Sequence, residues 1–300
     1  MIDYFAYSLH GLTVYSDIEL PELASHSHGR PDVRIRLGTL DGITVDWKRC
    51  TQYYLAPGRV ILNITGTARY FITDGVDILV DPHPGADRTM IRMFLLGTAM
   101  GCLLHQRGLL PLHANALCYN DECIMFLGQS GAGKSTLAAA MQKRGYELLA
   151  DDISVVKISG LELPIAYPGV PQIRLREDAA EYFDTDIGKL QRIFVGEDKY
   201  VLPAIAAYCQ RPLRIKRLYL LDYHEEAQPE FVDMHFLERI AAIRNNTYRK
   251  GMIAKMGVTL QHLSMSAIMA QSVPVRRFSR PRCSLEHLDR LLDAIEGDLV

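Results

Sequence analysis

Eight residues from Gly128 to Ser135 have the types and spacing that phosphate binding requires. They read Gly-Gln-Ser-Gly-Ala-Gly-Lys-Ser and fit the pattern G-x-x-x-x-G-K-[ST] at every fixed position. The glycines permit a tight loop whose amide N–H groups face phosphate oxygens. Lys134 adds a positive charge for the outer phosphates, and the Ser135 hydroxyl is a ligand for Mg2+. The predicted nucleotide site comprises Gly128, Gln129, Ser130, Gly131, Ala132, Gly133, Lys134, Ser135 and Thr136, with Lys134 facing solvent before nucleotide binds.

Two adjacent carboxylates follow the loop after a short distance. Asp151 and Asp152 come directly after residues 146–150, which have the composition of a brief buried strand. One carboxylate at such a strand end can hold Mg2+, and a second can accept the proton of an attacking hydroxyl. The pair therefore predicts metal-assisted phosphoryl transfer. An Asp-Asp turn that only caps the strand is the structural alternative.

Local elements position these groups. Residues 112–119 and 122–127 predict a β-hairpin that leads into the loop, and residues 136–143 predict a helix that leaves it and ends before Gly145. The helix N-terminus adds a partial positive charge for phosphate. If the strand keeps its period of two, His113 and Asn115 lie on the side that approaches the phosphates. A buried core histidine is the alternative for His113.

The hairpin, loop and aspartates together resemble a known family. The runs LHANA (residues 112–116) and FLGQSGAGKSTLAAAMQKRGYELLADDISVV (126–156) resemble the catalytic domain of HPr kinase/phosphorylase, a bacterial protein serine kinase. The resemblance covers about residues 109–157. It implies ATP and Mg2+ as cofactors, catalytic roles for His113 and Lys134, a base role for Asp151, and a metal role for Asp152. Spacing alone leaves the two aspartate roles exchangeable.

Other segments depart from HPr kinases. That family has a glycine-rich stretch after its aspartates, where this chain has YPGVPQIRL (residues 167–175). Residues 11–21 and 106–113 resemble instead the HPr-kinase-like proteins found with lasso-peptide biosynthesis. Members of that group phosphorylate the C-terminal serine of a precursor peptide. The resemblance therefore implies a serine-bearing peptide or protein as partner rather than HPr, and leaves a homo-oligomer open.

Other functions stay open on sequence grounds. A nucleotide-switched regulatory or binding module would need the loop and a metal-binding acid but no base. An HPr-type kinase/phosphorylase is another alternative. A small-molecule kinase would leave the N-terminal region without an evident role.

Basic residues outside the loop are candidate substrate contacts. Arg244 and Arg249 flank the end of a predicted helix and are candidates to reach the phosphoryl group or substrate. Helix capping is the alternative for both. Two basic runs are candidate docking sites for a carboxylate-bearing peptide, with a solvated charged face as the alternative: Arg211, Arg214, Lys216 and Arg217, and Arg276, Arg277, Arg280 and Arg282.

Composition narrows the protein class. The 300 residues carry a net charge of −2, which argues against a general nucleic-acid binder. Six scattered cysteines without a C-x-x-C pair predict free thiols in a reducing compartment. The N-terminus lacks the basic and apolar segments of a secretory signal, and the most apolar window, residues 90–104, is too short to span a bilayer. We therefore expect a cytoplasmic protein without membrane contact.

The order of elements predicts an α/β fold with two domains. Residues 1–88 have several short alternating runs between turn signals, which predict a smaller β-rich N-terminal domain. Residues 89–300 are predicted to form a P-loop kinase core of the HPr kinase type, entered through a linker at residues 81–87. Further expected elements are a buried helix at 90–104, a strand at 213–221, and helices at 176–183, 235–245 and 284–295.

Overall fold

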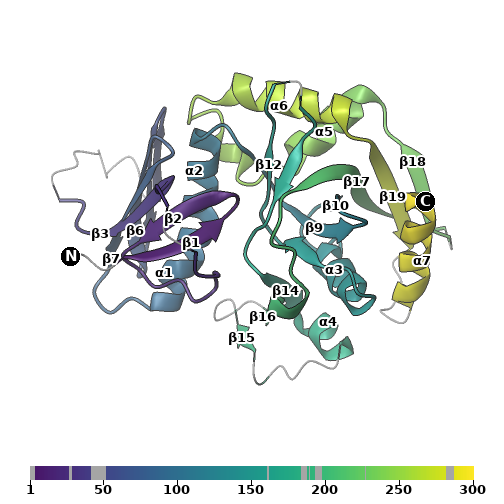
Figure 1. Cartoon of the computed structure of the whole chain (residues 1–300), viewed down its shortest axis with the longest axis horizontal. Coiled ribbons are helices and arrows are strands. Elements are labelled where there is room, and N and C mark those ends of the chain that lie inside the picture. The colour runs from purple at the N-terminus through teal and green to yellow at the C-terminus, as the bar shows by residue number, and fades with distance from the viewer. Residues whose placement is uncertain are drawn as a thin grey trace. The chain divides into compact units, whose positions relative to one another are not determined.

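The chain folds into a mixed α/β structure with a β-rich N-terminal unit, as predicted (Figure 1). The computed structural model describes residues 4–26, 29–41, 52–160, 162–183, 188, 190–192, 198–226, 228–281 and 287–300. The chain divides into two compact units. The first comprises Met1–Pro111 with Tyr248–Ser264, and the second comprises Leu112–Thr247 with Met265–Val300.

A seven-stranded sheet forms the body of the first unit. Its strand order is β1-β2-β3-β7-β6-β5-β4, with β2, β3 and β7 parallel and the other neighbours antiparallel. Alternate residues are buried along β6, as expected for a sheet with one face against a core. The first hairpin was not predicted; its turn places His10 and Gly11 at φ values of 55° and 74°. The strands are β1 (Phe5–Leu9), β2 (Leu12–Ser16), β3 (Val33–Leu37), β4 (Tyr53–Ala56), β5 (Arg59–Ile64), β6 (Ala68–Thr73) and β7 (Asp77–Pro82).

The predicted buried helix belongs to this first unit. It runs as α1 (Arg88–Phe94), a π-helical turn η1 (Leu95–Ala99) and α2 (Met100–Gln106). The Tyr70 hydroxyl donates to the carbonyl of Ile91 at 2.9 Å, so the helical segment is fixed to the β-sheet. The predicted linker is shorter than expected, because β7 extends to Pro82.

The division of the chain therefore differs from the predicted boundary at residue 88. The first unit continues to Pro111 and also takes in Tyr248–Ser264, which contains η4 (Lys250–Met252). The ring of Tyr248 packs on Gly101, where an added Cβ would lie 2.7 Å from the tyrosine Cδ1. This close approach fixes the returning segment on the helix. Such a long-range return leaves no local signal in the sequence.

The second unit is built on another mixed sheet. Strands β10, β17 and β19 run parallel to one another, whereas β9 and β11 on one side and β13 and β12 on the other pair antiparallel. The strands are β9 (Ala114–Tyr119), β10 (Glu122–Leu127), β11 (Leu148–Ala150), β12 (Ser154–Lys157), β13 (Ile165–Tyr167), β17 (Leu213–His224), β18 (Glu230–Asp233) and β19 (Val275–Pro281), with β8 (Leu110–Leu112) at the boundary of the units.

Helices and a small second sheet complete this unit. The three-stranded sheet has the order β14-β16-β15, from β14 (Gln172–Arg176), β15 (Gln191–Arg192) and β16 (Lys199–Pro203). The helices are α3 (Lys134–Lys143), α4 (Glu177–Tyr182), η3 (Ile205–Ala207), α5 (Phe236–Asn245) and α7 (Leu288–Leu299), while α6 (Thr259–Ser272) joins the two units. The predicted hairpin, loop helix, long strand and helices are present with shifted ends. The sequence did not predict β13 to β16, β18, β19 or α6.

None of the described helices is both long enough and apolar enough to cross a membrane.

Candidate nucleotide-binding site

The predicted loop joins β10 to α3 in the geometry of a phosphate-binding loop (P-loop). Gly128, Gly131 and Gly133 adopt φ values of 151°, 85° and 79°, which L residues with side chains rarely adopt. The amide of Ala132 donates to the carbonyl of Gln129 at 3.1 Å, which tightens the turn. The helix α3 begins at Lys134, two residues before the predicted start at residue 136, so Lys134 and Ser135 belong to its first turn. Backbone N–H groups at such a helix start are an anion site.

Lys134 does not face solvent, contrary to the expectation from sequence. The residue is only 7% exposed, and its ammonium donates to the carbonyls of Gly128 at 2.7 Å and Gln129 at 3.1 Å. The loop turns these carbonyls inward, so they satisfy a charge that burial would otherwise leave unpaired. Burial lowers the pKa of Lys134 to about 8, although Asp151 and Asp152 oppose the shift.

Arg280 on β19 and Tyr223 on β17 hold the loop through hydrogen bonds to its backbone carbonyls. The Arg280 guanidinium donates to the carbonyl of Ala132 at 2.7 Å and lies over the ring of Tyr223, 4.8 Å from its centroid. The Tyr223 hydroxyl donates to the carbonyl of Gly131 at 3.3 Å. Arg280 is 6% exposed. It therefore acts as a structural support of the loop rather than as the surface docking residue expected from the basic run.

Replacing Gly133 with alanine is expected to destabilise the protein more than the same change at Gly131. Both glycines have positive φ, so each alanine costs about 1–2 kcal/mol of backbone strain. At Gly133 the new Cβ would also lie 2.5 Å from the Arg280 guanidinium, whereas nothing lies within 4 Å at Gly131. Displacing a buried charged hydrogen bond adds about 1.5–3 kcal/mol. Chemical denaturation of both variants measures the difference, and equal losses would contradict the support role of Arg280.

Asp151 lies directly beneath Ser135 and is enclosed by donors. One carboxylate oxygen accepts from Asn115 Nδ2 at 2.6 Å and from Ser135 Oγ at 3.1 Å, and the other accepts from the amide of Arg174 at 2.7 Å. The residue is 8% exposed. Burial and the neighbouring Asp152 charge raise the pKa of Asp151 to about 6. The aspartate pair is therefore more than a strand cap.

Asp152 has a more open and more strongly cationic environment. Its carboxylate lies 3.1 Å from His113 Nδ1 and 2.6 Å from the Arg174 guanidinium, and its side chain is 22% exposed. Burial opposes ionisation, but the His113 hydrogen bond and the Arg174 charge outweigh it and hold the pKa of Asp152 well below its usual range. Asp152 also adopts a φ of 68°, which turns its side chain away from the strand direction.

The structure brings His113 into the site, as predicted from the hairpin. Its Nδ1 atom lies 3.1 Å from both a carboxylate oxygen and the backbone oxygen of Asp152, and its side chain is 34% exposed. His113 is therefore not a core histidine. Asn115, two residues after His113, lies on β9 and donates a hydrogen bond to the Asp151 carboxylate.

The donor set around Ser135 fits a hard divalent cation such as Mg2+. The Ser135 hydroxyl and the Asp151 carboxylate are oxygen ligands held 3.1 Å apart, which suits a cation of this class. The raised pKa of Asp151 shows a buried negative charge without full compensation. A bound cation would supply that compensation.

Two site residues were missed by sequence reasoning. Arg174 stands in the segment that departs from HPr kinases, and it contacts both aspartates. Asn246 accepts from the amide of Gly128 at 2.9 Å through its side chain and from the amide of His113 at 2.7 Å through its backbone. Only the Asn-Asn pair at the end of the predicted helix 235–245 signalled a change of structure there.

The arginines predicted as substrate contacts do not all belong to the unit that carries the loop. Arg244 is exposed in the last turn of α5, two residues before Asn246, and stays a candidate substrate contact. Arg249 lies in the first unit, where it donates to Thr98 Oγ1 at 2.6 Å. Arg214 is exposed on β17.

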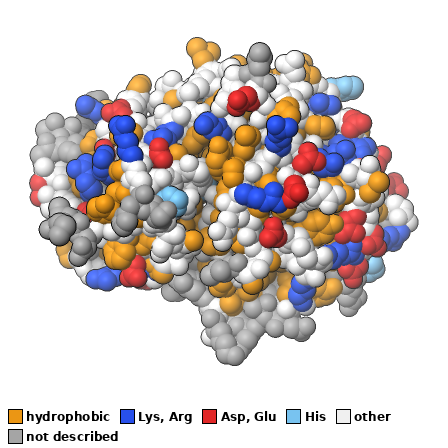
Figure 2. Space-filling view, viewed as in Figure 1, with side chains coloured by type: hydrophobic (Ala, Val, Ile, Leu, Met, Phe, Trp, Pro, Cys, Tyr) orange, Lys and Arg blue, Asp and Glu red, His pale blue; other side chains and the backbone are white. Residues whose placement is uncertain are grey.

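Most of the two basic runs is engaged in ion pairs. Basic and acidic side chains alternate over the face in Figure 2, without a large area of one sign. Arg282 lies outside the described residues, and Arg280 supports the loop. The remaining pairs are Arg211 with Asp121, Lys216 with Glu122, Arg217 with Asp298, Arg276 with Asp233 and Asp298, and Arg277 with Glu238.

Comparisons with known proteins show a likeness to solved structures but no sequence match. No protein-family model matches the chain, and no curated protein matches its sequence. Among similar solved structures is the HPr(Ser) kinase/phosphatase from Coxiella burnetii, at 15% identity and a TM-score of 0.32, with 62% of this chain and 95% of that chain covered. Because both values are low, this likeness carries no conclusion about the function of the chain.

Proposed function

We propose that this protein is an ATP-dependent serine kinase that acts on a peptide. The observation that carries the proposal is the contact between Ser135 Oγ and Asp151 at 3.1 Å, at the start of the helix that follows a glycine-rich loop. A hydroxyl and a carboxylate so placed are the protein groups that hold Mg2+ at nucleotide phosphates. A second carboxylate, Asp152, lies beside them with part of its side chain exposed.

The contacts favour an exchange of the two aspartate roles. Asp151 is buried and bonded to Ser135, so it suits the metal side of the site. Asp152 is the more exposed of the two, so it is better placed to meet a substrate hydroxyl and accept its proton. Its low pKa keeps it ionised. A weak base suffices, because phosphoryl transfer depends mostly on positioning and charge stabilisation.

Each remaining group has a defined task in this scheme. Mg2+, when bound at Ser135 and Asp151, would neutralise charge on the phosphates. Lys134 exchanges its loop carbonyls for phosphate oxygens. His113 and Arg174 hold the Asp152 carboxylate in place, and Asn115 orients Asp151.

For the acceptor we propose a serine at or near the C-terminus of a short precursor peptide. The resemblance of residues 11–21 and 106–113 to lasso-peptide kinases supports this choice. An extended peptide end can enter a site without the broad surface that a folded partner needs. Arg244 is exposed two residues before Asn246, whose side chain holds the amide of Gly128, so it is the candidate to receive the peptide carboxylate. Arg214 is also exposed, but it lies beside the start of β10, at the end of the strand away from the loop.

Transfer of labelled γ-phosphate from ATP tests the proposal. The acceptor is a mixture of synthetic peptides with randomised residues before a C-terminal serine, and its matched control is the same mixture with an amidated terminus. Label is expected on the free peptides and less on the amidated ones. Label only in inorganic phosphate would favour a nucleotide-switched module, and efficient labelling of folded HPr would favour the HPr-type alternative. Equal labelling of both mixtures would remove the carboxylate part of the proposal.

The apparent affinity for Mg2+ is expected to fall below pH 6. Asp151 must be ionised to bind the cation, and its pKa is raised to about 6 by burial and by Asp152. Protonation therefore competes with the metal, and the affinity approaches a tenfold loss per pH unit below that pKa. Mg2+ titrations with a fluorescent ADP analogue between pH 5 and pH 8 measure the effect. In the Asp151→Asn variant the nucleotide phosphates still titrate, but the part of the pH dependence of Mg2+ affinity that Asp151 causes should be lost. A pH dependence equal to that of the native protein would contradict the metal role of Asp151.

A further inference from the structure

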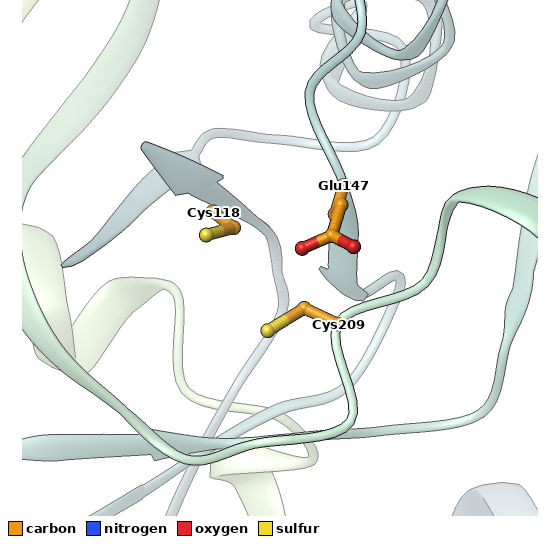
Figure 3. Close-up of side chains that lie close together, drawn as sticks. All are labelled: Cys118, Glu147 and Cys209. Atoms are coloured by element: carbon orange, nitrogen blue, oxygen red, sulfur yellow. The ribbon is translucent and has the colours of Figure 1, made fainter. Parts of the chain in front are cut away.

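A second group of metal-binding side chains lies away from the loop in the second unit. The side chains of Cys118, Glu147 and Cys209 lie close together, and their ligand atoms are all within 4.8 Å of one another (Figure 3). The three residues come from the end of β9, the residue before β11, and the segment before β17. The cysteines are scattered in the sequence, but the fold brings Cys118 and Cys209 together, with Cys123 opposite Cys118 on β10.

Backbone hydrogen bonds fix the three segments in this arrangement. The amide of Cys118 donates to the carbonyl of Glu147 at 2.9 Å, and the amide of Cys209 donates to the carbonyl of Leu148 at 2.8 Å. Tyr208 forms a parallel bridge with Leu148. The side chains therefore converge because the backbone is already in place, which lowers the entropic cost of binding a ligand.

The spacing suits a small tetrahedral cation. Zinc–sulfur bonds of about 2.3 Å imply a separation of about 3.8 Å between two ligating sulfurs. The ligand atoms lie within 4.8 Å of one another, so side-chain rotations that move them about 1 Å closer would give the separation of zinc ligands. Glu147 is exposed and Cys118 is half-buried, so a fourth position can be filled by water.

The ligand types select the metal. Two thiols and one carboxylate favour Zn2+ over Mg2+, which prefers oxygen ligands alone. Burial raises the pKa of the Cys118 thiol, while the Arg211 guanidinium opposes that shift. Arg211 is itself paired with Asp121, which limits its repulsion of a cation.

We propose that Cys118, Glu147 and Cys209 bind Zn2+, with water as the fourth ligand. This zinc site is separate from the Mg2+ site, because Glu147 precedes Asp151 by four residues along an extended segment, roughly 13 Å. The ion would tie together β9, which carries Asn115, and β11, which leads to Asp151. It would stabilise the strands beneath the aspartates without contacting nucleotide.

Binding of Co2+, which reports thiolate ligation through a charge-transfer absorption band, tests the proposal. The purified full-length protein, reduced and freed of metal with a chelator, is titrated with Co2+ and then with Zn2+. The thiolate band is expected to saturate at one Co2+ per chain and to be abolished by Zn2+. The absence of a saturable thiolate band would overturn the proposal.

Variants identify the ligands. Cys118→Ser and Cys209→Ser should each lose the thiolate band or weaken Co2+ binding at least 100-fold, and Glu147→Gln should weaken it at least tenfold, the scale of ligand and support losses in metal sites. Glu147 is exposed, so its variant tests the site without disturbing the core. Cys102→Ala, a buried cysteine of the first unit, is the matched control and should bind normally. Normal binding by Cys118→Ser would overturn the assignment.

Alkylation with mass spectrometry separates metal binding from a redox role. The protein isolated without added reductant should show both Cys118 and Cys209 as thiols that alkylate once metal is removed. A Cys118–Cys209 disulfide in that material would overturn the zinc site. Both results are independent of kinase activity, so they stand apart from the test of the proposed function.

Discussion

Lys134→Ala is expected to lower phosphoryl transfer by about 10²–10³-fold, the scale of losing one group that stabilises transition-state charge. The variant removes the ammonium that lies at the carbonyls of Gly128 and Gln129, at the base of the loop. Initial rates of γ-phosphate transfer at saturating peptide measure the loss.

Lys143→Ala is the matched control for this prediction. Lys143 ends the same helix and donates to the carbonyl of Phe183 at 3.2 Å, away from the loop. Its variant should transfer at a rate close to that of the native protein. Because Lys134 is buried, thermal unfolding of both variants must accompany the rates. Substantial transfer by a folded Lys134→Ala protein would contradict the nucleotide site.

Asp152→Asn is expected to lower transfer by about 10²–10⁴-fold while nucleotide binding survives, since the change removes a base but keeps the shape. Asparagine also tolerates the positive φ of 68° at this position. The change removes the charge that His113 and Arg174 face. Single-turnover rates and ADP affinity, measured on the same protein, separate the two effects.

Asp121→Asn controls for the backbone. Asp121 also has a positive φ, 64°, and is paired with an arginine, but it lies in the turn of the hairpin. Its variant should transfer normally. If Asp152→Asn transfers normally and Asp151→Asn does not, the base is Asp151, as the family resemblance implied.

The parts of the site that could be predicted from sequence are those encoded by neighbouring residues. The loop follows from eight consecutive positions, and the aspartates and His113 follow from adjacent strands with a clear hydrophobic pattern. Arg280, Asn246 and Arg174 could not be predicted. They reach the loop and the aspartates from 148, 118 and 23 residues away, so their contacts depend on the order of strands in the sheet.

The same distinction explains the domain division and the cysteines. Strands β3 to β7 were predicted from short local runs of residues, whereas the hairpin of β1 and β2 was not. The return of Tyr248 to Gly101 joins segments nearly half the chain apart, which no local pattern records. Cys118 and Cys209 appeared unrelated for that reason too. Their convergence depends on the bridge between Leu148 and Tyr208.

The resting position of Lys134 sets a threshold for ligands. Its ammonium already donates to two carbonyls within the loop. A ligand must replace these hydrogen bonds before it can contact the ammonium. A neutral or weakly charged molecule would leave the lysine where it is and gain only the backbone amides. A chain of phosphates offers several charged oxygens at once and can drive the exchange. The loop is therefore expected to bind polyphosphates in preference to single small anions, because only a polyphosphate offers enough charged oxygens to replace both carbonyls.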